Sequence, residues 1–270
     1  MENYINILFP FLKKAGKLAL KQQRMIFASE KVDGSIVTNA DLKISDMFGK
    51  LIKKHFKNHY VLDEEKALKT INLKEKVEKS EFLWTIDPID GTKAYFQGAK
   101  FFALAIGFYK NLKPIFGIIY LPATSEIIYN DENAVYYITN AFKKNQVKTI
   151  LTFQKKPLNK NSLVYFSVKN AYKYIKNYKF TFIDEYSAYI YAFNTLLNVS
   201  QGAFLKDNIS MWDVYATLPI ADKLGFGVYN INNEEKLTKI DFDLFKEDFK
   251  AKNIWLICHP EYKDELMSIL

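Results

Sequence analysis

The sequence of 270 residues has few of the side chains that most often build zinc, redox and nucleophilic sites. It contains one cysteine, Cys258, which excludes an internal disulfide and a zinc site built from paired thiolates, so a reducing, cytoplasmic location is expected. It contains three histidines. Two of them, His55 and His59, are four residues apart on a predicted lysine-rich helix face, where a solvated surface is expected rather than a zinc site.

Long apolar runs are also absent. Residues 186–205 carry no charge, but they include Asn194 and Gln201, which are costly in hydrocarbon, so we expect a buried helix that leads into a strand. The N-terminal segment has apolar residues at helical spacing, interrupted by Lys13 and Lys17, and is predicted to be an amphipathic helix rather than a signal peptide. No membrane partner is expected.

Positive charge is in excess, with 38 basic and 30 acidic residues and a formal net charge of +8. Such a balance can indicate a polyanionic partner. The lysines, however, alternate with acids in stretches such as LKEKVEKSE (residues 73–81), and a general richness in lysine explains the charge equally well. No nucleic-acid polymer is therefore expected as a partner.

Apolar periodicity predicts a mixed α and β chain without internal repeats. Helices are expected over residues 3–29 and from Asp41 to Phe56, with a turn at Asp33-Gly34 between them. Further expected elements are strands over residues 60–62 and 82–86, a hairpin of 101–109 with 114–122, a strand pair at SEIIYN and AVYYIT, short strands at LVYFSV, KFTFID and IWLICH, and helices over about 187–200 and 213–224. The stretch 143–161, rich in lysine and asparagine, is predicted to join two units.

Two aspartates follow the apolar strand in FLWTIDPIDGT (residues 82–92). Pro88 between them stiffens the chain and favours an extended Asp87. Asp90-Gly91-Thr92 is typical of a helix start, where free N–H groups favour a phosphate. Carboxylates beside a phosphate would repel it unless cations lie between them, and Mg²⁺ takes such oxygen ligands.

An isolated DPxDG is more simply explained as a turn followed by a helix cap. Further acids at the ends of predicted elements favour the cation interpretation. Asp63-Glu64-Glu65 follows a predicted strand, Asp213 opens a predicted helix, and Asp41 lies at the head of another.

The segments KVDGSIVTNAD, LDEEK, WTIDPIDGT and MWD, in this order and at these separations, resemble the inositol monophosphatase superfamily of metal-dependent, lithium-sensitive phosphomonoesterases. The resemblance extends from the first helix to about Gly227. It implies an α/β (α+β) fold, a layered α/β/α/β/α sandwich. We divide the chain accordingly into an N-terminal α+β subdomain, 1–142, with most metal ligands, and a C-terminal α/β subdomain, 143–270, with the substrate cap and the last ligand.

The resemblance also implies a metal site with two or three Mg²⁺ ions. Glu64, Asp87 and the carbonyl of Ile89 would ligate the first ion, and Asp87, Asp90 and Asp213 the second. A loosely bound third ion would lie near Glu64. Four carboxylates require about two divalent ions for neutrality, and paired metals can stabilise the entering and leaving oxygens of an in-line displacement.

The implied catalytic residues are Asp41, Thr92 and Glu64. In this arrangement Asp41 and Thr92 orient and deprotonate the attacking water. The amides of Gly91 and Thr92 would bind the phosphate, and Asp213 would also face the substrate. The implied partner is a small phosphate ester, and a homodimer is open, because members of the family are often dimers.

The sequence departs from the common family pattern outside the metal ligands. Asp63 and Tyr186 stand where glycines are usual, and Lys206 stands where the sugar-phosphatase branch has an acid that contacts the inositol ring. Lys206, together with Lys93 of DGTK, favours a substrate with a second phosphate. Both lysines can equally be ordinary surface residues of a lysine-rich chain.

The expected substrate is a 3'(2'),5'-bisphosphate nucleotide, because DGTK followed by a residue and an aromatic resembles that nucleotidase branch. Inositol monophosphate is the second choice, and fructose 1,6-bisphosphate and histidinol phosphate stay open. A non-catalytic protein that binds anions or RNA is the alternative of another class. Clustered acids argue against it, since a pure anion binder gains nothing from them.

Overall fold

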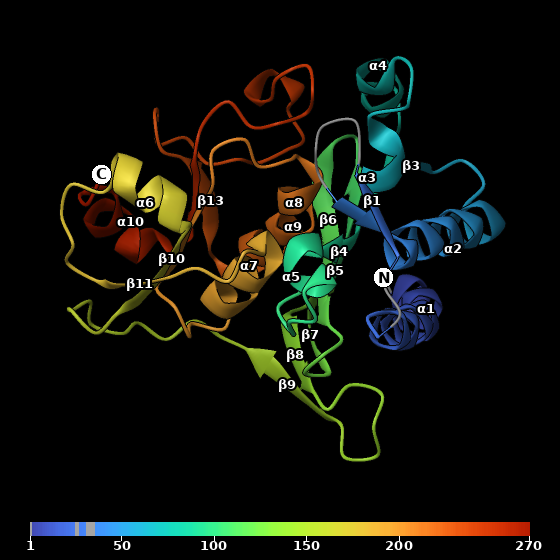
Figure 1. Cartoon of the computed structure of the whole chain (residues 1–270), viewed down its shortest axis with the longest axis horizontal. Coiled ribbons are helices and arrows are strands. Elements are labelled where there is room, and N and C mark those ends of the chain that lie inside the picture. The colour runs from blue at the N-terminus through green and yellow to red at the C-terminus, as the bar shows by residue number, and fades with distance from the viewer. Residues whose placement is uncertain (1, 25–26, 31–35) are drawn as a thin grey trace.

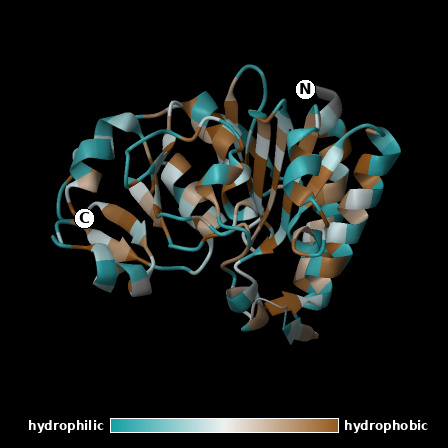
Figure 2. Cartoon of the chain, turned by 90° about the horizontal axis from the view of Figure 1, so that it is seen from above, coloured by the Kyte–Doolittle hydropathy of each residue, from teal (hydrophilic) through white to brown (hydrophobic). Residues whose placement is uncertain are grey.

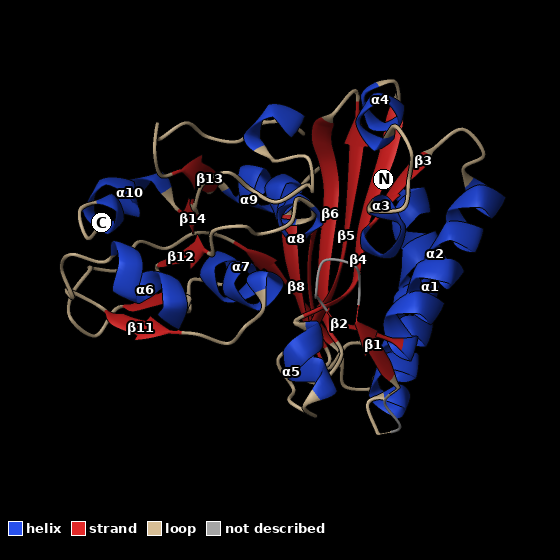
Figure 3. Cartoon of the chain, turned by 45° about the horizontal axis from the view of Figure 1, so that its top comes forward, coloured by secondary structure: helices blue, strands red, loops and turns tan. Residues whose placement is uncertain are grey.

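The chain folds into alternating layers of helices and strands, seen from two sides in Figures 1 and 3. The computed structural model describes residues 2–24, 27–30 and 36–270. Two long helices, α1 (Glu2–Gln22) and α2 (Asn39–His55), form the first layer and cover one face of a seven-stranded sheet. In sheet order its strands are β3 (Tyr60–Asp63), β4 (Phe82–Asp90), β5 (Ala103–Lys110), β6 (Lys113–Leu121), β7 (Glu126–Asn130), β8 (Val135–Thr139) and β9 (Val147–Leu151).

A middle layer of helices packs on the other face of this sheet. It consists of α7 (Ala188–Leu196), α8 (Trp212–Tyr215) and α9 (Thr217–Leu224). Beyond it lies a five-stranded sheet with strands in the order β11 (Thr181–Ile183), β10 (Leu163–Phe166), β12 (Gly202–Leu205), β14 (Trp255–Cys258) and β13 (Gly227–Asn230). The outer helices are α6 (Val168–Tyr174) and α10 (Pro260–Met267). The expected α/β/α/β/α sandwich is confirmed.

Short elements complete the described chain. They are β1 (Ala28–Glu30), β2 (Ile36–Thr38), α3 (Glu64–Ala67), α4 (Leu73–Glu78), α5 (Thr92–Phe96) and the 3₁₀ helix η1 (Phe242–Leu244).

The first helix is shorter than its sequence predicts. It ends at Gln22 instead of near residue 29, because Ala28–Glu30 pairs antiparallel with Ile36–Thr38 and this pairing needs an extended backbone. The predicted turn at Asp33-Gly34 lies outside the described residues. The first sheet includes β9, so it continues past residue 142, and the division of the chain into two subdomains stays a prediction.

Alternating side chains give the first sheet two apolar faces. Along β5, Leu104 and Ile106 pack toward α1 and α2, whereas Ala103 and Ala105 pack toward α7, α8 and α9. Figure 2 shows hydrophobic residues along the central strands and hydrophilic residues on the outer sides of the helices. The middle of this sheet is therefore a rigid, buried platform. Within the described part of the chain, no helix combines the length and apolar character that crossing a membrane requires.

Candidate metal centre

A register shift in β4 brings its two aspartates to one face of the sheet. Asp87 lies opposite Ala105 of β5 and Asp90 lies opposite Ala103, so β4 contains one extra residue over this interval. Pro88 lies within it and has no N–H group to give to the ladder. In a regular strand residues i and i+3 point to opposite faces. The extra residue allows Asp87 and Asp90 to share the face toward the middle layer, while Ile89 packs in the core under α1 and α2.

Glu64 is presented by a short helix that begins directly after β3. Asp63, only 3% exposed, caps this helix and accepts a hydrogen bond from the backbone N–H of Glu65 (3.1 Å). Its other oxygen accepts hydrogen bonds from the Ser45 hydroxyl on α2 (2.6 Å) and from the Lys66 ammonium (3.0 Å). Asp63, which departs from the family glycine, thus ties the turn that carries Glu64 to α2.

Helices α7 and α8 bring the remaining acids into position. Asp90 Oδ2 accepts hydrogen bonds from the hydroxyl of Ser187 and from the backbone N–H of Tyr189, each at 2.6 Å. Asp213 lies at the start of α8, and its Oδ2 accepts a hydrogen bond from the backbone N–H of Ser210 (3.1 Å). The hydroxyl of Tyr189 donates to the carbonyl of Trp212, so α7 and α8 are joined beside the site.

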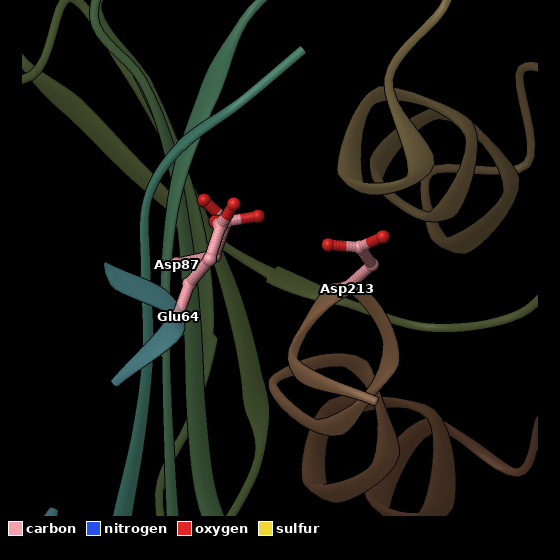
Figure 4. A group of neighbouring side chains, drawn as sticks. All are labelled: Glu64, Asp87 and Asp213. Atoms are coloured by element: carbon pink, nitrogen blue, oxygen red, sulfur yellow. The ribbon is translucent and has the colours of Figure 1, made fainter. Parts of the chain in front are cut away.

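The carboxylates of Glu64, Asp87 and Asp213 converge, as Figure 4 shows. Each offers an oxygen, and these three atoms lie within 4.8 Å of one another. Both oxygens of Asp87 are buried without a hydrogen-bond donor. A buried, unpartnered carboxylate is costly, and a cation is the simplest compensation. An all-oxygen set of this kind fits Mg²⁺, which prefers carboxylates, phosphate and water as ligands.

Burial and mutual repulsion raise the pKa values of the clustered carboxylates. Burial, and then the charges of Glu64 and Asp90, raise the pKa of Asp87 well above its usual value. Burial and the charge of Asp90 raise the pKa of Asp213 from 3.8 to about 8. Burial also raises the pKa of Asp90, although the hydrogen bonds from Ser187 and Tyr189 oppose this. A bound cation would stabilise the ionised carboxylates and so oppose these shifts.

Lys206 lies next to this cluster. It is exposed at the end of β12, and its charge lowers the pKa of both Asp90 and Asp213 against the effect of burial. The predicted substrate lysine is therefore close to two of the acids. Lys93 is exposed on α5.

Gly91 lies beside the acids with φ +82°, a conformation that favours glycine. A Cβ atom there would lie 2.7 Å from the carbonyl oxygen of Phe101 and 3.1 Å from Cβ of Ser187. Only glycine therefore fits between these two segments at the start of α5. The role of the Gly91 and Thr92 amides in binding phosphate stays a prediction.

The predicted catalytic residues Asp41 and Thr92 each form a hydrogen bond with a residue three positions away in the sequence. Asp41 is fully buried in the first turn of α2, and its Oδ2 accepts hydrogen bonds from the backbone N–H of Thr38 (2.9 Å) and from the Thr38 hydroxyl. Thr92 donates its hydroxyl proton to the carbonyl of Ile89 at 2.9 Å. Asp41 lies near α5, since its charge contributes to the raised pKa of Tyr95. The joint role of Asp41 and Thr92 stays a prediction.

Sequence reasoning missed Ser187 and Tyr189, which hold Asp90. Their positions are about a hundred residues from Asp90 along the chain, so no local spacing reveals the contact. A serine directly before a buried apolar helix is, however, a recognisable N-cap, and Ser187 does accept the N–H of Ile190 at 3.1 Å. The sequence around Ser187 therefore predicts the helix cap but not the hydrogen bond to Asp90.

Comparison with known proteins places this geometry in a family. The model of the inositol monophosphatase family matches residues 1–269. The "Fructose-1,6-bisphosphatase/inositol-1-monophosphatase" of Aquifex aeolicus (strain VF5) is 28% identical over 218 residues, which cover 76% of this chain and 75% of that protein. The "3'(2'),5'-bisphosphate nucleotidase CysQ" of Haemophilus influenzae is 30% identical over 129 residues, 47% of each chain.

A solved structure shares the fold across the whole chain. It is an IMPase/NADP phosphatase complexed with Mg²⁺ and phosphate, and it superposes with a TM-score of 0.79. The match covers 100% of this chain and 95% of that chain at 14% sequence identity. At this identity the comparison supports the fold, while the family model supports the family.

Proposed function

Because the chain belongs to the inositol monophosphatase family, whose members are metal-dependent phosphomonoesterases, we propose that its substrate is a bisphosphorylated nucleotide such as 3'-phosphoadenosine 5'-phosphate. The reaction adds water to the phosphoryl group and releases inorganic phosphate and an alcohol. The proposal concerns the part of the substrate beyond the phosphate that is cleaved.

The observation that carries this proposal is the cation at Lys206. It is close enough to Asp90 and Asp213 for its charge to lower the pKa of both, and it stands where the sugar-phosphatase pattern has an acid for a polyol hydroxyl. A lysine there attracts a second phosphate and cannot accept a hydrogen bond from a sugar hydroxyl. Lys93 on the first turn of α5 would add to this field. The similarity to the Haemophilus influenzae nucleotidase points the same way.

We assign metal binding, phosphate binding and proton transfer to different residues of the site. Glu64, Asp87 and the carbonyl of Ile89 would hold the first metal ion, and Asp87, Asp90 and Asp213 the second. The convergence of Glu64, Asp87 and Asp213 supports this assignment. Mg²⁺, when bound, neutralises phosphoryl oxygens and makes a water molecule a better nucleophile.

The remaining roles concern the substrate and the proton. The amides of Gly91 and Thr92 would bind oxygens of the phosphate at the start of α5. Asp41, with Thr92, would orient the attacking water and take its proton. No nucleophilic side chain is needed, because the water attacks directly.

A phosphate-release assay tests the substrate. The purified chain is given 3'-phosphoadenosine 5'-phosphate, inositol 1-phosphate, fructose 1,6-bisphosphate and histidinol phosphate, each with Mg²⁺ and with a chelator. The proposal expects the highest kcat/KM for the bisphosphorylated nucleotide and no turnover after chelation. Preference for inositol 1-phosphate or fructose 1,6-bisphosphate, as the name of the Aquifex aeolicus relative suggests for that protein, would contradict it.

The same assay addresses the non-catalytic alternative. A protein that only binds anions would release no phosphate from any of the four esters and would bind them equally well after chelation. Calorimetric titration of Mg²⁺ would count the ions, for which we expect two or three, and would show whether Li⁺ competes with any of them.

A further inference from the structure

Tyr186 adopts a backbone conformation that bulky residues avoid. Its φ is +58°, in the left-handed region, where the Cβ atom of an ordinary residue is crowded. Glycine adopts such a φ without strain, whereas a tyrosine does not. The tyrosine side chain is nevertheless 71% exposed, so it does not compensate for the strain by packing in the core.

Neighbouring groups fix this conformation. Asp184 Oδ1 accepts the backbone N–H of Tyr186 at 3.0 Å and the hydroxyl of Tyr191, and Asp184 Oδ2 accepts the N–H of Val168 at 2.8 Å. Residue 187 then begins the cap of α7. The segment is therefore held at both sides of Tyr186, and the ring is presented from a defined position.

That position borders the metal centre. The next residue, Ser187, donates its hydroxyl proton to Asp90 at 2.6 Å. Its Cβ would lie 3.1 Å from a Cβ placed on Gly91, so the segment also lines the predicted phosphate cradle. Tyr186 directly precedes Ser187, so its exposed ring belongs to the segment that contacts Asp90 and lies against Gly91.

The charged residues around Tyr186 indicate which part of a substrate its ring could contact. Two acids, Asp184 and Glu185, precede it in sequence and oppose a second phosphate at this place. Lys206, on the other hand, lies beside Asp90 and Asp213 and suits that phosphate. An exposed aromatic ring suits a flat, uncharged group, and nucleobases stack well on such rings.

We infer that Tyr186 is a specificity-determining residue that stacks on the base of a nucleotide substrate. The inference rests on the proposed function and adds the contact that distinguishes a nucleotide from a polyol phosphate. It also explains why a strained tyrosine stands where glycine would fit freely.

The test compares Tyr186→Gly and Tyr186→Phe on 3'-phosphoadenosine 5'-phosphate and inositol 1-phosphate. For Tyr186→Gly we expect KM for the nucleotide to rise about tenfold, equivalent to about 1.4 kcal/mol, while KM for inositol 1-phosphate changes less than about twofold. Tyr186→Phe keeps the ring and should keep the nucleotide KM. The melting temperature of Tyr186→Gly should not fall, because glycine accepts the positive φ.

Tyr172→Ala is the matched control, since Tyr172 is an 84% exposed tyrosine on α6, and its nucleotide KM should equal that of the wild type. An equal change in both KM values for Tyr186→Gly, with the wild-type preference for the nucleotide retained, would overturn the inference while leaving the proposed function intact. A wild-type preference for inositol 1-phosphate, or a failure of the wild type to release phosphate from either ester with Mg²⁺, would instead overturn the proposed function.

Discussion

The two sides of the metal centre differ in how strongly the reaction constrains which residues can occupy them. The first side is the end of β4 with α3, where Asp87 lies on the sheet, Glu64 begins the helix that follows β3, and both match the family pattern. The second side includes the end of β12 and the segment before α7, where Lys206 and Tyr186 depart from the pattern and are exposed. Cleavage of a phosphate needs the first set in fixed geometry, whereas the second set contacts only what differs between substrates.

The largest effect should come from removing a charge on the first side. Asp87→Asn eliminates the most buried of the three converging carboxylates. We expect kcat to fall about a thousandfold, as the loss of several kcal/mol of charge stabilisation requires. The metal-free variant should melt at the same or a higher temperature, because a repelled and unpartnered carboxylate is gone.

Asp131→Asn is the control for this variant. Asp131 accepts the N–H groups of Asn133 and Ala134 in the turn after β7, away from the acids. Its activity should equal that of the wild type. Retained activity in Asp87→Asn would remove the distinction between the two sides of the centre.

A charge reversal on the second side should change the choice of substrate instead. Lys206→Glu restores the acid of the sugar-phosphatase pattern. We expect the ratio of kcat/KM for nucleotide over inositol 1-phosphate to fall about a hundredfold, because a contact to a phosphate becomes repulsive. The ratio is measured by phosphate release, and Lys113→Glu, at the distant start of β6, reports any general effect of charge. An equal loss of kcat/KM on both substrates would show that Lys206 acts in phosphate cleavage rather than in the choice of substrate.

The cap beneath Glu64 should have a smaller effect. Asp63→Gly restores the usual family residue but loses the bonds to the N–H of Glu65, to Ser45 and to Lys66. We expect Mg²⁺ affinity, measured by calorimetry without substrate, to fall about tenfold. Asp131→Gly should lose comparable turn contacts and leave Mg²⁺ affinity unchanged. Equal affinities in both variants would show that the cap serves stability alone.

The smallest effect concerns pH in the metal-free protein. Because the pKa of Asp213 rises from 3.8 to about 8 on folding, the folded state binds more protons than the unfolded state between these values. The free energy of unfolding should therefore decrease as pH rises through this window. With a chelator, the melting temperature should fall by a few degrees between about pH 5 and pH 8, and saturating Mg²⁺ should remove this fall. A flat profile with chelator would contradict the repulsion among the acids.

Much of the first side could be predicted from local sequence. An apolar run followed by DPIDGT predicts a buried strand with acids at its end, and β4 with Asp87 and Asp90 confirms that placement. The strand extends through Asp90, however, with a bulge rather than a simple turn. The bulge depends on pairing with β5, which the sequence of β4 alone does not specify.

Contacts between distant segments could not be predicted. The sequence predicts His59 on a solvated helix face, and this is wrong: α2 ends at His55, and His59 accepts a hydrogen bond from Trp84 Nε1 at 2.9 Å among stacked rings. Similarly, the partners of Asp90 on α7 depend on how the middle layer packs against the sheet. Local patterns specify elements, whereas these contacts follow from tertiary packing.

The most direct test of the central claim is a crystal structure of the chain grown with Mg²⁺ and phosphate. The account predicts magnesium ions bound among Glu64, Asp87, Asp90 and Asp213, with the phosphate at the amides of Gly91 and Thr92. If ordered crystals at saturating Mg²⁺ show these carboxylates around no cation, the account is contradicted.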